Sequence, residues 1–280
     1  MAHIRAIAAG TAPKSVHLPT ELALLVLLSF LWGGSFTLIK IAVETIPPAS
    51  MVAVRVTGAA VLLLLVARWR ELPIPSGRAI WGALLVQGLL QSALPFTLIG
   101  WGEMHIDSGL AGVLNATPPI FVFLITLLVT RHERIDRQKT LGVMLGMIGV
   151  AVVIGAKALR GLGSEQPLVL LAILGASLCY AVAPIWARRF GGQPALVTAA
   201  GAMTCAALVM APVALVVDRP WTLSPSPGAI VALGLLSVFS TALAMVIFFR
   251  LLRTLGALGT SSGGYLRAGF SVVLGIVILG

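Results

Sequence analysis

The chain has 280 residues, of which 59% are hydrophobic and 10% are charged, and its mean hydropathy is +1.05. A soluble protein carries roughly 25% charged residues, so this sequence cannot cover a water-facing surface. A net charge of +10 would suit a nucleic-acid-binding protein, but the positions of the charges, described below, argue against that partner.

Residues 1–20 form a mild tail whose only apolar stretch is interrupted by Arg5, which argues against a cleaved signal peptide. Apolar runs of about 20 residues follow, the length that crosses a bilayer as one helix. They predict nine spans, at residues 21–43, 48–67, 79–101, 108–130, 139–156, 167–187, 195–217, 227–249 and 258–279. The fold class is therefore an all-α polytopic membrane protein.

Lysine and arginine are distributed unequally between alternate loops, and positive residues favour the cytoplasmic side. One set of loops holds Arg5, Lys14, Arg68, Arg70, Arg78, Arg131, Arg134, Arg137, Lys139, Arg188, Arg189, Arg250 and Arg253. The other set holds Lys157, Arg160 and Arg219. We therefore expect a cytoplasmic N-terminus in a plasma membrane, the inner membrane of a bacterium, and no nucleic-acid partner.

Two pairs of segments indicate an internal repeat. "WGGSFTLIK" at 32–40 matches "YAVAPIWAR" at 180–188, and "SALPFTLIGW" at 92–101 matches "TALAMVIFFR" at 241–250, at nearly the same offset. The repeat has five helices, so the second copy is inverted, a transporter architecture with its binding site near the membrane midplane. We predict a tail at 1–20, a first repeat at 21–157 and a second repeat at 158–280. A tenth span is expected beyond Gly280, so the chain looks C-terminally truncated.

Several stretches resemble EamA-type ten-helix exporters of the drug/metabolite transporter superfamily: "LWGGSFTLIKIAVETIPPASMVAVRV", "AGVLNATPPIFVFLITLL", "GVMLGMIGVAVVIG" and "FFRLLRTLGALGTSSGGYL". The resemblance implies a helix bundle with a central cavity and export of amino acids or other small amphipathic metabolites. The sequence departs from the family pattern at Ala268, where a proline is usual, and in lacking the tenth helix.

Three basic residues lie inside predicted spans, where a charge indicates function. Lys40 and Arg55 lie toward span ends, and we expect their long side chains to reach outward to water. Arg267 lies about nine residues into the ninth span, ~13 Å along the helix. The nine acids all lie at span ends or in loops, so none is expected to pair with it at that depth. It is predicted to bind a substrate carboxylate, or else to be structural or to face the cytoplasmic vestibule.

Aromatic and polar side chains at depth complete the predicted substrate-binding site. The aromatic residues could form walls for an apolar ligand body, or an interfacial belt, which is the favoured interpretation of Trp101. The polar residues could bind substrate or join helices by hydrogen bonds. "NATPP" at 115–119 frees carbonyls that could bind an ammonium group, or simply kinks the helix. The predicted residues are Trp32, Ser35, Gln91, Trp101, Asn115, Tyr180, Phe248, Tyr265 and Arg267.

No acid or histidine lies mid-span, so we expect transport without a buried titratable carboxylate for proton coupling. Cys179 and Cys205 lie in apolar runs and are interpreted as packing residues. The sequence has no metal-ligand or cofactor motif, so we expect neither, and no enzymatic activity.

The leading hypothesis is an exporter of amino acids, with aromatic or other apolar ones favoured, working by alternating access. Export of drugs or nucleobase-like metabolites is the alternative. A lipid-modifying membrane enzyme would need clustered acids, histidines or cysteines, and the one charge cluster, "RHERIDRQK", has the composition of a positive-inside loop. An oligomeric channel or flippase subunit is a third possibility. The expected partners are a small-molecule substrate and the lipid bilayer, with the protein a monomer or weak homodimer.

Overall fold

The computed structural model describes residues 17–130, 137–161 and 167–279. Most of the predicted N-terminal tail and residues 131–136 of the charge cluster lie outside the described residues.

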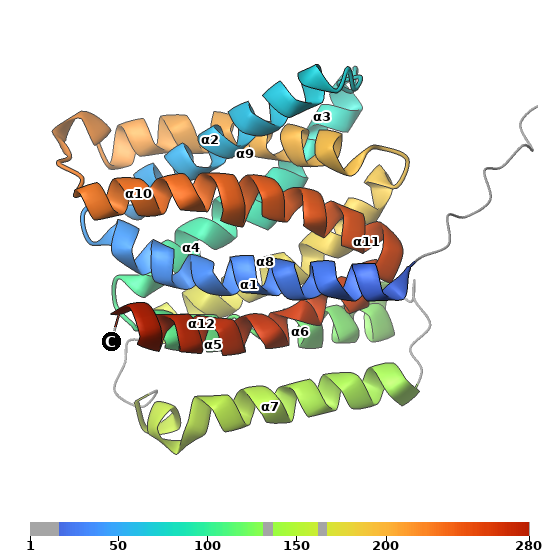
Figure 1. Cartoon of the computed structure of the whole chain (residues 1–280), viewed down its shortest axis with the longest axis vertical. Helices are drawn as coiled ribbons and strands as arrows, with labels where there is room; N and C mark the ends of the chain where they lie inside the picture. Colours follow the sequence, from blue (N-terminus) through green and yellow to red (C-terminus); the bar gives the residue numbers. More distant parts are fainter. Residues whose placement is uncertain (1–16, 131–136, 162–166, 280) are drawn as a thin grey trace, which may run out of the picture.

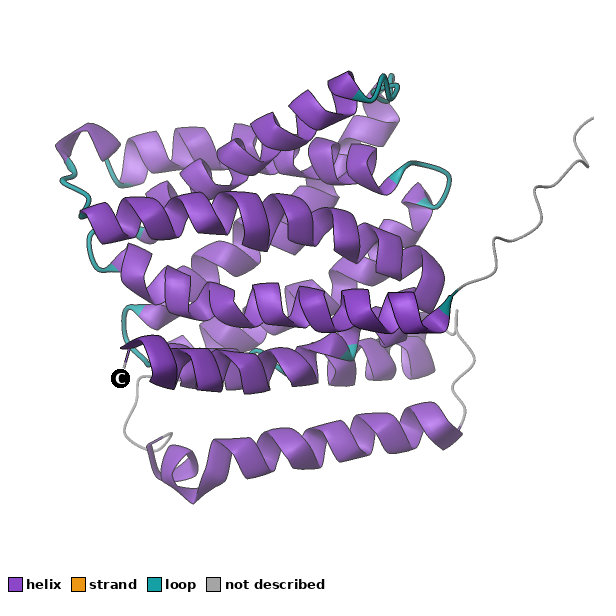
Figure 2. Ribbon diagram, in the orientation of Figure 1, coloured by secondary structure: helices purple, strands orange, loops and turns teal. Residues whose placement is uncertain are grey.

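The described residues form helices joined by short turns (Figure 2). The first half contains α1 (Leu18–Val43), α2 (Pro48–Trp69), α3 (Arg78–Gly88), η1 (Leu89–Ala93), α4 (Leu94–Glu103), α5 (Ser108–Leu114), α6 (Pro118–Ile125), η2 (Thr126–Thr130) and α7 (Arg137–Gly161). The second half contains α8 (Pro167–Ala187), η3 (Arg188–Phe190), α9 (Ala195–Val217), η4 (Pro220–Thr222), α10 (Pro227–Leu235), η5 (Leu236–Leu243), α11 (Ala244–Ser261) and α12 (Gly263–Leu279).

Seven helices of the described part are long and apolar enough to cross a membrane, and two shorter apolar helices, Thr140–Gly149 and Gly263–Leu279, lie in the fifth and ninth predicted spans. The stretch Pro227–Ser261 is one continuous helical run. It breaks at Gly256, whose φ of 73° lies in the left-handed region that glycine tolerates best. The break falls in the predicted turn between the eighth and ninth spans. The all-α polytopic fold class is confirmed.

The helices lie side by side in one bundle, with the start of α1 and the end of α12 on opposite sides (Figure 1). At one edge α2 packs along α9, and α7 lies at the other edge. Both helices carry fully buried small residues, Ala59 on α2 and Ala199 and Ala202 on α9. They allow close backbone approach where apolar attraction between helices is weak.

The backbone is irregular at corresponding places in the two halves. Residues 89–93 in the third span are π-helical, and so are residues 236–243 in the eighth. Adding the sequence offset of 149 to the first range gives 238–242, which lies inside the second. The fourth span is interrupted between α5 and α6, and the ninth by a turn at Ser262. These irregularities agree with the internal repeat, although the predicted boundary at residue 157 falls within α7, and the division into two domains stays a prediction.

Candidate functional site

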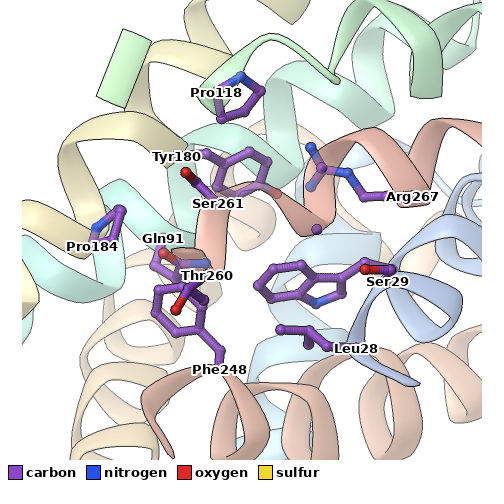
Figure 3. A pocket seen from close by; sticks show the side chains of 13 residues that line it. Leu28, Ser29, Gln91, Pro118, Tyr180, Pro184, Phe248, Thr260, Ser261 and Arg267 are labelled. Carbon is purple, nitrogen blue, oxygen red and sulfur yellow. The ribbon is translucent and has the colours of Figure 1, made fainter. Parts of the chain in front are cut away.

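The irregular backbone segments surround a cavity at the centre of the bundle. Its buried part, called here the inner chamber, is lined by Trp32, Ser35, Phe36, Ile39, Arg55, Phe96, Ile99, Asn115, Tyr180 and Arg267. An adjoining pocket shares Trp32, Tyr180 and Arg267 with the chamber and extends along α8, α11 and α12 (Figure 3). The two spaces therefore form one continuous candidate site.

Arg267 is positioned by the interruption of the fourth span. The carbonyl of Asn115 would normally accept a hydrogen bond from the backbone N–H four residues later, but that residue is Pro119 and the one before it is Pro118. Neither has an N–H to donate. The Arg267 Nη2 donates to this free carbonyl instead. The guanidinium lies 5.6 Å from the Tyr180 ring centroid, and the side chain is 6% exposed.

Arg55 is positioned by the π-helical segment of the eighth span. Its Nε donates to Thr241 Oγ1 at 2.7 Å and its Nη2 to the Ser240 carbonyl at 3.4 Å. Its Cζ lies 3.8 Å from the centroid of the Phe96 ring. The same Ser240 carbonyl accepts a hydrogen bond from Trp32 Nε1 at 3.2 Å. The widened turn therefore holds two side chains that line the chamber.

The expectation that Arg55 and Lys40 reach outward to water is wrong. Arg55 is 1% exposed and points into the inner chamber. The Lys40 ammonium donates to the backbone carbonyls of Glu103 at 2.7 Å and Ile106 at 2.9 Å. Those carbonyls belong to the end and turn of a helix, where the regular acceptor positions lack helical donors, so they can satisfy the ammonium within the protein.

Arg55 was missed because its distance from the span end favoured solvent. In the structure Arg55 follows Val52 by three residues and precedes Ala59 by four, and both are fully buried. That spacing places all three on one face of a helix. The exposed face of α2 is also apolar, with Val54 and Leu65, so the sequence did not show which face points inward.

The structure brings together seven of the nine predicted residues, namely Trp32, Ser35, Gln91, Asn115, Tyr180, Phe248 and Arg267, which line the chamber or the adjoining pocket. Two others lie elsewhere. Trp101 packs on His105, with ring centroids 4.9 Å apart. Tyr265 donates its hydroxyl to the Val143 carbonyl at 3.3 Å. Phe36, Phe96 and Thr260 also line the site and were not predicted.

Several polar atoms at the site have no hydrogen-bond partner within the described part of the chain. The donors are Arg55 Nη1 and Arg267 Nε. The acceptors are Asn115 Oδ1, Gln91 Oε1 and Thr260 Oγ1. In Figure 3, Gln91, Thr260 and Phe248 lie on one side of the pocket and Arg267 lies on the other. Buried polar groups are normally paired, so this set can receive a ligand with both an anionic group and hydrogen-bond donors.

The two arginines of the chamber form no ion pair with an acid among the described residues. Over residues 17–130, 137–161 and 167–279, the ion pair found joins Arg250 to Glu21 at 2.8 Å, and neither Arg55 nor Arg267 pairs with a carboxylate. A buried charge without a partner costs several kcal/mol. An anion that enters the inner chamber would offset this cost.

The expectation that no carboxylate is buried is wrong. Glu21 is 4% exposed and Glu103 is 0% exposed, both within candidate membrane spans. Glu103 was placed just beyond a span end because the apolar run stops at Trp101, but α4 continues through Glu103 against its neighbours. Glu21 pairs with Arg250 and accepts a hydrogen bond from Thr254.

Comparison with known proteins agrees with the fold and shows a similarity to a family of transporters. Residues 20–155 match the model of the EamA-like transporter family. The uncharacterized inner membrane transporter YedA of Escherichia coli K12 is 28% identical over 89% of this chain and 79% of its own length. These matches support the drug/metabolite transporter superfamily for this chain. The chain is thus a membrane transporter.

Two further relatives and a solved structure are also similar to the chain. The transporter YvbV of Bacillus subtilis is 26% identical over 91% of this chain and 83% of its own length. Protein PagO of Salmonella typhimurium is 24% identical over 81% of this chain and 75% of its own length. A crystal structure matches with a TM-score of 0.67 at 17% identity, over 92% of this chain and 94% of that chain, which indicates a shared fold.

Proposed function

We propose that this drug/metabolite transporter moves small amphipathic metabolites that carry a carboxylate, amino acids above all, through the central cavity by alternating access. The observation that carries the proposal is the pair of buried arginines, Arg55 and Arg267, which line one chamber without an acidic partner among the described residues. Guanidinium groups bind carboxylates through charge-assisted, often two-pronged hydrogen bonds. The direction expected from the family resemblance is export.

The unpaired acceptors favour a zwitterion over a simple anion. Asn115 Oδ1 lies on the residue whose carbonyl holds Arg267. An α-amino acid keeps its ammonium next to its carboxylate, so a carboxylate on Arg267 brings the ammonium near Asn115. Ammonium groups are donors only, which matches an acceptor without a donor. Asn115 is therefore the proposed ammonium ligand.

The rest of the cavity suits an apolar side chain. The Trp32 and Phe248 rings pack with centroids 5.7 Å apart, and Leu28 and Pro184 line the same pocket. Aromatic walls with a few convergent polar groups are typical of small-molecule sites. Aromatic and aliphatic amino acids are therefore proposed ahead of sugars or strongly polar compounds.

The location follows from the fold and the charges. We propose that the protein spans the inner membrane of its cell, as the name of the YedA relative indicates for that protein, with its N-terminus in the cytoplasm. The loops on the N-terminal side carry most of the arginines, including Arg188, Arg250 and Arg253.

The test is flux in liposomes containing the full-length protein. Labelled phenylalanine is compared with phenethylamine, which lacks the carboxylate, with 3-phenylpropionate, which lacks the ammonium, and with adenine as a nucleobase. Each is measured with wild type, Arg267→Gln and the matched control Arg68→Gln, an exposed arginine at the end of α2.

We expect wild type and Arg68→Gln to transport phenylalanine, and Arg267→Gln to lose phenylalanine and phenylpropionate selectively. Equal fluxes in wild type and Arg267→Gln would contradict a carboxylate ligand at Arg267. Transport of adenine without phenylalanine would support the alternative of a nucleobase-like substrate instead.

A further inference from the structure

Glu103 is a buried carboxylate for which the cavity just described gives no explanation. It ends α4 and is 0% exposed, and neither of its carboxylate oxygens has a hydrogen-bond partner among the described residues. The other buried carboxylate, Glu21, has both an arginine and a threonine as partners. A carboxylate without donors is costly to bury in its charged form, so Glu103 differs from an ordinary structural ion-pair residue.

Glu103 lies next to the inner chamber along the same helix face. Phe96 and Ile99 line the chamber, and Glu103 follows Ile99 by four residues. Side chains spaced by three and four residues share one face of a helix. Glu103 is therefore about one helical turn, ~5.4 Å, beyond the lining of the chamber.

Two cations act on this carboxylate, Lys40 from α1 and Arg55 from α2. Neither forms an ion pair with it within the described ranges, because Lys40 is bound to backbone carbonyls and Arg55 to the π-helical segment. The other helices that pack on α4 add no charge: α8 and α5 contain no charged residue, and the titratable side chains of α8 are Cys179 and Tyr180. Arg55 is thus shared between Glu103 and the chamber.

We propose that Glu103 is a proton-binding site coupled to the substrate carboxylate, so that the transporter carries a proton together with its substrate. The combined proton and substrate gradients set the direction of transport, so export requires an outward substrate gradient larger than the inward proton gradient. The inference rests on the proposed function, because it assumes a carboxylate in the chamber. Ionised Glu103 and the bound carboxylate compete for the positive charge of Arg55. A proton on Glu103 removes this competition, and by reciprocity a bound carboxylate favours the proton. Proton and substrate therefore bind together and are released together.

The experiment measures accumulation of labelled phenylalanine in liposomes with a pH gradient of one unit and no membrane potential. Wild type is expected to concentrate phenylalanine on the alkaline side, up to about tenfold for one proton per substrate. Glu103→Gln is expected to exchange phenylalanine between the two sides but to lose the accumulation. Glu103→Asp should retain it. Glu44→Gln, an exposed carboxylate at the same end of the bundle, should behave as wild type.

The outcomes separate this inference from the proposed function. If wild type transports phenylalanine and a pH gradient drives no accumulation, the proton coupling is wrong and the transport assignment stands. If Glu103→Gln still accumulates phenylalanine, or loses exchange as well as accumulation, Glu103 is not the coupling site. If wild type transports no carboxylate of the panel, the proposed function fails and this inference fails with it.

Discussion

The two arginines of the inner chamber come from opposite halves of the chain and are held in a reciprocal way. Arg55 lies on α2 in the first half and is bound by Ser240 and Thr241 of the second half. Arg267 lies on α12 in the second half and is bound by the Asn115 carbonyl of the first half. Each half thus supplies one cation and one irregular backbone segment that positions the cation of the other half.

The two positioning segments differ in how the backbone becomes irregular. The first half uses two prolines, which leave a carbonyl without its helical donor. The second half uses a π-helical turn, in which an altered hydrogen-bond pattern exposes Ser240 and Thr241 to α1 and α2. A carbonyl acceptor for a buried cation can therefore arise from prolines in the sequence or from the geometry of a helix. Only the prolines can be recognised in the sequence.

The strongest test of this reciprocity is Arg55→Gln. It removes a cation that faces the chamber and should lower the apparent affinity for phenylalanine about 10- to 100-fold, because a hydrogen bond to a charged group contributes roughly 1.5–3 kcal/mol. The measurement is the concentration dependence of flux in liposomes. If Arg55→Gln changes affinity no more than the exposed control Arg68→Gln, Arg55 has no role in substrate binding.

The two prolines that leave the Asn115 carbonyl free can be replaced together in the variant Pro118→Ala, Pro119→Ala. The new N–H groups can bond the carbonyls of the preceding turn, including that of Asn115, so Arg267 loses its acceptor. We expect apparent affinity to fall roughly 5- to 10-fold, the equivalent of about one hydrogen bond. The control is Pro212→Ala, an exposed proline within α9. Unchanged affinity in the double variant would mean that Arg267 is positioned by other contacts.

The role of the π-helical segment in positioning Arg55 is tested by Thr241→Val. This substitution keeps the side-chain shape and removes the hydroxyl that accepts a hydrogen bond from Arg55 Nε. We expect apparent affinity to fall about 3- to 10-fold, since a typical hydrogen bond contributes roughly 0.5–1.5 kcal/mol. Thr204→Val on α9, whose hydroxyl bonds its own helix backbone, should have little effect. A larger loss of apparent affinity for phenylalanine in Thr204→Val than in Thr241→Val would contradict the proposed role of the π-helical segment.

The smallest effect is expected for Trp101→Phe, because Trp101 packs on His105 and does not line the cavity. Flux should change less than about twofold, as for substitutions away from a functional feature. Trp32→Phe, which removes the donor to the Ser240 carbonyl, should have the larger effect. The reverse order would place the aromatic part of the site near Trp101.

The amino-acid sequence by itself determined the fold class and the approximate limits of the spans, because apolar runs and short polar turns are local features. It also indicated seven of the cavity residues, among them Trp32, Tyr180 and Arg267, which are unusual for their depth. The double proline at Pro118 and Pro119 predicted a free carbonyl in the fourth span. Its occupant, the guanidinium of Arg267, could not be predicted because the two lie 152 residues apart.

Only the tertiary structure decided which cations face inward and which acids are buried. Arg55 and Lys40 were expected at water, and Glu103 outside the membrane core, because their distances from the span ends permitted it. Packing of α2 against η5 and α4 enclosed Arg55, and packing of α4 against its neighbouring helices enclosed Glu103. Whether a charged side chain near a helix end meets water or protein depends on its neighbours in space, and these are set by helix packing rather than by local sequence.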